Sequence, residues 1–150
     1  MADLITPELV DLNLTADDRH QATRLLAQRL QSAGRVTDLE GFMADIAARE
    51  AQMPTGIEGG IGIPHCRSEH VTDATLGFGR ATKGIDWGAA DGPANLIFLI
   101  AAPAGGGAEH MNILAQLARR LVHPSFREQL LSAPDEESVV GLINKEVLGR

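Results

Sequence analysis

Hydrophobic residues recur along the chain with two different periods. Residues 10–14 alternate apolar and polar side chains, which is typical of a half-buried strand. Residues 15–18 then offer a capping hydroxyl with an acid three positions on, and apolar residues follow at helical spacing as far as Gly34. The same start signal returns at residues 37–40. It predicts a second helix that runs to about Glu50, with four apolar positions: Phe42, Met43, Ile46 and Ala47.

The middle of the chain is divided into short apolar segments. Residues 61–63, 74–80 and 95–101 are bounded by glycine, proline or an Asp-Gly-Pro signal, so each predicts a strand. The run at residues 96–100 does not alternate, which indicates a central strand with both faces covered.

Helical periodicity returns in the last third. Residues 109–122 form a strongly amphipathic pattern, and shorter helices are expected at residues 124–131 and 135–147. Together the segments predict an α/β fold, a single three-layer domain with a mixed β-sheet flanked by helices on both faces. The sequence shows neither an internal repeat nor a long linker, so we expect one domain over residues 1–150.

Composition and charge exclude several classes of function. With 13 basic and 20 acidic residues the net charge is −7, which disfavours nucleic acid because the chain repels its phosphate backbone. The single cysteine, Cys66, rules out an internal disulfide and suits a reducing compartment. The longest apolar run, residues 96–102, is too short to cross a membrane, and the first residues begin no signal peptide. We therefore expect a cytoplasmic protein.

Two of the five histidines are distinguished by their surroundings. His65 ends the segment GIEGGIGIPH, whose four glycines permit close approach to the backbone. Pro64 stiffens the chain directly before it, so the imidazole is delivered from a rigid strand end. A glycine-rich turn with an incidental histidine is the alternative. His20 and His123 have no chemical partner nearby in the sequence, and we interpret both as structural.

His110 is the second candidate. Its spacing within the helix at residues 109–122 places it on the apolar, inward-facing side. A helix N-terminus disfavours the imidazolium and attracts anions, because its first N–H groups lack internal partners. The glycines at residues 105–107 would let a bulky anion or a protein approach closely. The alternative is a histidine that serves only as a helix cap.

These features point to a histidine that accepts a phosphoryl group. A neutral imidazole attacks phosphorus without losing an alcohol proton, and the reaction asks mainly for in-line placement and charge stabilisation. Arg49, just upstream of the glycine segment, would supply a planar guanidinium for the phosphoryl oxygens. A surface ion pair of Arg49 with Glu50 or Glu40 is equally consistent with the sequence.

Competing chemistries have weaker support. Residues 65–70 hold potential metal ligands, but neighbours in an extended chain point to opposite faces and no known zinc spacing is matched. Cys66 beside His65 would be a thiol nucleophile only if the two side chains met, and a lone cysteine is usually a buried small hydrophobe. Nucleotide-binding motifs are absent from the sequence. We therefore expect no metal and no cofactor.

Several motifs together resemble the fructose-type EIIA domain (mannitol/fructose family, EIIA type-2) of the bacterial phosphoenolpyruvate-dependent sugar phosphotransferase system, or PTS. They are REAQMPT running into GIEGGIGIPH, then GIDW and DGP, then LIFLIAAP, and finally His110. The resemblance covers nearly the whole chain. Two positions depart from the family pattern, since Gly62 replaces a frequent alanine and Cys66 a frequent glycine, and neither change removes a reacting atom.

The resemblance implies a phosphorelay. The carrier protein HPr would donate a phosphoryl group to His65, which would pass it to a cysteine of EIIB, for sugar uptake through the EIIC permease. His110 and Arg49 would steady the phosphoryl group. A regulatory EIIA of the nitrogen-related type, which signals by phosphorylation-dependent binding of a partner, is the alternative. A metal-binding or purely structural module is a weaker one.

Overall fold

A computed structural model describes residues 3–52, 56–57, 59–88, 92–105 and 108–147. The described strands form a mixed sheet with the order β1-β5-β6-β3-β2, in which β4 also pairs with β6. The strands are β1 (Val10–Asp11), β2 (Gly56–Ile57), β3 (Ile61–Gly62), β4 (His65–Ser68), β5 (Thr75–Ile85) and β6 (Ala94–Pro103). The helices are η1 (Pro7–Leu9), α1 (Arg19–Ser32), α2 (Leu39–Gln52), α3 (Ala108–Leu121), α4 (Pro124–Ser132) and α5 (Glu136–Glu146).

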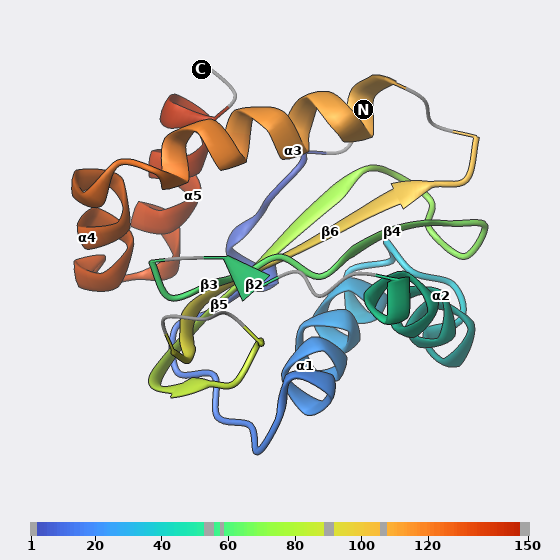
Figure 1. Ribbon diagram of the computed structural model, residues 1–150. Coiled ribbons are helices and arrows are strands. Elements are labelled where there is room, and N and C mark those ends of the chain that lie inside the picture. Colours follow the sequence, from blue (N-terminus) through green and yellow to red (C-terminus); the bar gives the residue numbers. More distant parts are fainter. Residues whose placement is uncertain (1–2, 53–55, 58, 89–91, 106–107, 148–150) are drawn as a thin grey trace.

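Helices cover both faces of the sheet. Figure 1 shows α1 and α2 on one side and α3, α4 and α5 on the other. The core is accordingly divided into two clusters. Leu26, Phe42 and Ile97 belong to the cluster under α1 and α2, while Phe98 and Leu117 belong to the cluster under α3 to α5. The predicted three-layer α/β architecture is therefore confirmed.

Strand β6 organises the sheet. It runs antiparallel to β5 along one side and parallel to both β3 and β4 along the other, so β4 continues the line of β3. The side chains of residues 97–101 are all buried, which confirms the prediction of a strand covered on both faces. The predicted alternation at residues 10–14 is present in the burial of Val10, Leu12 and Leu14, but the strand itself is shorter than predicted and ends at Asp11.

Three details differ from the sequence prediction. The first two helices are capped by aspartates and not by the threonines that begin the start signals. Asp18 accepts a hydrogen bond from Gln21 N at 2.8 Å, and Asp38 accepts one from Gly41 N at 3.2 Å. Ala47 is exposed although it was expected on the apolar face. Finally, β2 and β4 form strands in the glycine-rich and polar stretch on either side of β3, where the sequence lacks an apolar run.

Candidate functional site

His65 is the first residue of β4, and its side chain is 9% exposed. Its neighbour Cys66 belongs to the core cluster under α1 and α2. Because successive side chains of a strand point to opposite faces, His65 faces the layer of α3 to α5. Its register partner on β6, Ile100, lies in the cluster on that side. The acceptor candidate is thus on the same face as the helix that carries His110.

A hydrogen bond fixes the chemical state of the His65 ring. Nδ1 lies 2.8 Å from the carbonyl oxygen of Ile63, two residues earlier. A carbonyl oxygen only accepts hydrogen bonds, so Nδ1 carries the proton. In the neutral ring the lone pair is then on Nε2, which makes Nε2 the nucleophilic nitrogen. The sequence did not reveal this contact, because it depends on the backbone path through Pro64.

The chain before His65 is anchored to β6. Ile100 N donates to the Pro64 carbonyl at 3.0 Å, and Leu96 N donates to the Gly60 carbonyl at 3.0 Å. Strand pairing with β6 is therefore interrupted only at Ile63 and Pro64, and it resumes at His65. The prediction of an imidazole held at a rigid point beside a strand agrees with this arrangement, although the strand begins at His65 instead of ending there.

Arg49 lies in the last turn of α2, the helix that packs against β4. The two elements run in opposite directions, since Asp38 lies 4.0 Å from His70 and Asp45 accepts a 2.6 Å hydrogen bond from Ser68. One helical turn beyond Asp45 is about 6 Å, or about two strand residues, so Arg49 lies level with the start of β4.

The structure separates the two expectations for Arg49. Glu40 is bound on both carboxylate oxygens by Arg24, at 2.8 Å each, and is not a partner of Arg49. This ion pair lowers the pKa of Glu40, because the Arg24 hydrogen bond stabilises the carboxylate. Among the described residues, no ion pair involves Arg49. Of the two expectations for Arg49, the ion pair with Glu40 is therefore wrong, while the contact with a phosphoryl group stays a prediction.

His110 lies in the first turn of α3, which packs against β6 on the face that carries His65. The helix begins one residue earlier than predicted, and its inward side buries Ile113, Leu117 and Leu121 as expected. The orientation of the His110 side chain lies outside what the structure describes, as do residues 53–55, 58 and 106–107.

Cys66 lies next to His65 and has a different environment. The side chain is buried against α2, and burial together with the nearby Asp45 carboxylate raises the pKa of the thiol to about 12. The thiol therefore stays protonated at neutral pH, when it is a poor nucleophile and a poor metal ligand. In the part of the chain that the structure describes, no three His, Cys, Asp or Glu side chains gather as a metal site requires.

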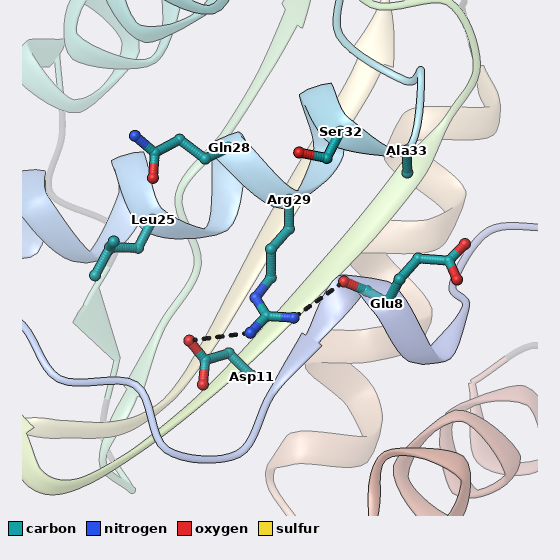
Figure 2. A pocket seen from close by; sticks show the side chains of 7 residues that line it. All are labelled: Glu8, Asp11, Leu25, Gln28, Arg29, Ser32 and Ala33. Carbon is teal, nitrogen blue, oxygen red and sulfur yellow. Dashed lines mark hydrogen bonds and ion pairs between the residues drawn. The ribbon is translucent and has the colours of Figure 1, made fainter.

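A separate groove of about 640 Å³ lies between α1 and η1 (Figure 2). Arg29 spans it, donating to the Glu8 carbonyl at 3.2 Å and lying 3.7 Å from Asp11. The groove adjoins β1, at the end of the sheet away from β4. Arg29 is thus already bound by groups of the protein itself, and none of the candidate site residues lines the groove.

Among the described helices, none is long and apolar enough to cross a membrane.

Comparison with known proteins identifies relatives over the whole chain. Residues 3–146 match the family model described as "Phosphoenolpyruvate-dependent sugar phosphotransferase system, EIIA 2". The chain is 38% identical over 145 residues to the PTS system fructose-specific EIIA component of Haloferax volcanii, covering 95% of this chain and 94% of that protein. It is 33% identical over 146 residues to the PTS system fructose-specific EIIABC component of Bacillus subtilis. That match covers 97% of this chain but 23% of the larger protein.

A solved structure has the same fold. The nitrogen regulatory protein IIA-Ntr from Neisseria meningitidis superimposes with a TM-score of 0.86 and 26% sequence identity. The match covers 93% of this chain and 96% of that one.

Proposed function

The chain belongs to the EIIA 2 family of the phosphoenolpyruvate-dependent sugar phosphotransferase system, and we propose that its His65 carries the phosphoryl group. As a member of this family it is a phosphotransferase component. The observation that carries the proposal is the 2.8 Å hydrogen bond from Nδ1 of His65 to the Ile63 carbonyl, which leaves the nucleophilic lone pair on Nε2.

The transfer at His65 is a direct exchange of one N–P bond for another. The Nε2 lone pair forms the new bond to phosphorus while the N–P bond of the donor breaks, and its electron pair stays on the donor nitrogen. Nδ1 keeps its proton throughout. The phosphorylated ring gains positive character, and a hydrogen bond from a more positive N–H to a carbonyl is stronger. The Ile63 carbonyl thus stabilises the product more than the reactant.

Two further residues act on the phosphoryl oxygens in this proposal. Arg49 reaches them from α2 with a planar guanidinium, which binds two oxygens at once. His110 acts from the first turn of α3, where the N-terminal end of the helix favours negative charge. The two residues belong to opposite layers of the fold, so they approach the phosphoryl group from opposite sides of the β4 edge.

The partners follow from the chemistry of the relay. The donor is HPr in its phosphohistidine form, and the acceptor is a cysteine of EIIB, which serves fructose-type uptake through EIIC in the cytoplasmic membrane. The names of the Haloferax volcanii and Bacillus subtilis relatives support the fructose assignment. The Bacillus subtilis name also supports EIIB and EIIC as partners, since one chain there combines the A, B and C components. The exchange with HPr takes place in the cytoplasm.

Labelling from phosphoenolpyruvate tests the proposal. Purified enzyme I and HPr, primed with radioactive phosphoenolpyruvate, transfer an acid-labile label to the wild-type protein, and His65→Ala takes up none. His123→Ala is the matched control, because His123 caps α4 without a side-chain hydrogen bond and should label like wild type. Retention of label in His65→Ala assigns the group to another residue and ends the proposal.

The regulatory alternative rests on the similarity to the nitrogen regulatory protein of Neisseria meningitidis. A regulatory EIIA accepts the phosphoryl group on the same histidine but signals by binding a partner. The discriminating measurement adds purified fructose-type EIIB to the phosphorylated protein. Label that moves to the EIIB cysteine supports the transport role, and label that stays on His65 favours the regulatory one.

A further inference from the structure

The indole of Trp87 lies flat against the backbone of Gly62, three residues before His65. A Cβ atom added at Gly62 would lie 2.5 Å from Cδ2 and 2.8 Å from Cγ and Cε2 of Trp87. The indole therefore occupies the space in which any other residue at position 62 would place its side chain. Trp87 is only 1% exposed, so the ring is held in the core and not on a mobile surface.

The contact is adjacent to the hydrogen bond that fixes His65. Gly62 is followed directly by Ile63, whose carbonyl accepts the proton of His65 Nδ1. The chain pairs with β6 at Ile61 and Gly62 and is bonded to β6 again at the Pro64 carbonyl, so Ile63 lies in the short break between these contacts. The indole supplies a flat, rigid support against the strand at the point where the Ile63 carbonyl must be oriented.

The indole of Trp87 also lies near α2, the helix that carries Arg49. Trp87 lines a cavity of about 160 Å³ together with residues of α2, among them Met43, Ile46 and Ala47. Arg49 follows in the next positions of this helix. The indole thus lies between the strand that leads to His65 and the helix that carries Arg49.

We propose that Trp87 is a positioning residue for phosphoryl transfer, acting on His65 through Gly62. This inference rests on the proposed function of His65. It also gives a physical reason for glycine at position 62 in this chain, since even an alanine methyl group would displace the ring. A ring that is pushed off Gly62 has the neighbouring cavity to move into, so we expect Gly62→Ala to fold while the support of Ile63 is lost.

The structure offers a matched control in the same row of the sheet. Gly62 and Gly79 both pair with Ile97 of β6, one from β3 and the other from β5, so all three face α1 and α2. A Cβ at Gly79 would lie 2.6 Å from Leu14 Cδ2, which is the end of a flexible side chain and moves aside more easily than the Trp87 ring. Gly79→Ala therefore disturbs the same core without touching the segment that leads to His65.

The experiment compares Gly62→Ala, Trp87→Phe, the double variant and Gly79→Ala with wild type. Long-range ¹H–¹⁵N spectra of the unphosphorylated proteins report which ring nitrogen of His65 carries the proton, and labelling from phospho-HPr gives the transfer rate. We expect Gly62→Ala to mix the two tautomers and to lower the maximal rate about 10- to 100-fold, as a misplaced reacting group does. The smaller ring in the double variant should restore the Nδ1–H tautomer and most of the rate.

Each other outcome overturns the inference. A wild-type tautomer and rate in Gly62→Ala, a loss of equal size in Gly79→Ala, or no recovery in the double variant would each show that Trp87 does not position His65. The spectra also keep the inference separate from the proposed function. If wild type takes no label from phospho-HPr, the proposed function fails, while the tautomer of His65 in the four variants still decides whether Trp87 orients the ring.

Discussion

Cys66, next to His65, is expected to contribute to the packing of the core but not to phosphoryl transfer. Its thiol has a pKa raised to about 12 by burial and by Asp45, so it is protonated at neutral pH. We expect Cys66→Ala to accept the phosphoryl group at nearly the wild-type rate and to lose about 1 kcal/mol of stability, a typical cost for a small core truncation. Initial labelling rates and urea unfolding measure the two effects. If Cys66→Ala took up no label, the result would contradict the proposal that His65 carries the phosphoryl group.

Arg49 offers a second test at the scale of one side chain. A lysine keeps the charge but cannot bind two phosphoryl oxygens with one planar group. We therefore expect Arg49→Lys to lower the transfer rate about tenfold, with stability changed by less than about 0.5 kcal/mol. The control is Arg24→Lys, which weakens the exposed ion pair with Glu40 on the same layer of helices. Equal rates in the two variants would remove Arg49 from the site.

The sequence names the candidate residues of the site, but it does not show which nitrogen of the His65 ring carries the proton. Glycines and Pro64 around His65 signal a constrained backbone, and such constraints are local in sequence. The proton on Nδ1 depends instead on the direction of the Ile63 carbonyl, which follows from how the chain passes from β3 to β4. The contact between Trp87 and Gly62 was not predicted, because the two residues are distant in the sequence and meet only in the folded chain.

At the scale of elements, Arg80 of β5 fastens the C-terminal end of α4. Its Nη1 donates to the carbonyl oxygens of Leu130 and Leu131 at 3.1 Å and of Ala133 at 2.9 Å. The Leu130 carbonyl otherwise accepts a long, 3.5 Å hydrogen bond from Ala133 N, and a cation at this end of the helix also interacts favourably with the helix dipole. We expect Arg80→Met to lower the free energy of unfolding by about 2–3 kcal/mol.

Urea unfolding of Arg80→Met measures this loss, and Arg119→Met is the control. Arg119 makes a single 3.4 Å hydrogen bond to Gln116 on the exposed side of α3, so its removal should change little. Transfer from phospho-HPr should survive in both variants, because α4 contributes no group to the site. A stable Arg80→Met protein would mean that packing alone holds α4 against the sheet.

The long amphipathic helices were predicted to within a few residues because their apolar spacing is set by burial on one face. Strands β2 and β4 were not predicted. They are short, and their residues GI and HCRS have neither alternation nor an apolar run. They become strands because β3 and β6 offer unpaired backbone groups beside them, which is a property of the assembled sheet and not of the segment. The caps were misassigned because each threonine is followed by an aspartate that caps the helix instead, Asp18 three residues after Thr15 and Asp38 directly after Thr37.

At the scale of the whole molecule, the proposed site combines all three layers. Arg49 comes from the α1–α2 layer, His65 from the sheet, and His110 from the layer of α3 to α5. β4 pairs only with β6 among the described strands, so its other edge is where groups from the two helical layers can meet. His65 itself is only 9% exposed, so the proposed role requires the donor and the acceptor to approach it from outside the sheet at this edge.

This arrangement predicts coupling between two residues on opposite helical layers. Arg49→Ala and His110→Ala should each slow transfer to EIIB, and the double variant should lose less than the sum of the two free-energy effects, because both residues bind the same phosphoryl group. In the unphosphorylated protein the layers are held by separate cores, so the stabilities of the two variants should add within about 0.5 kcal/mol. Transfer rates and urea unfolding of the four proteins complete the cycle. If the two effects on the transfer rate were additive, Arg49 and His110 would not bind the same phosphoryl group, and at least one of them would have to be removed from the proposed site.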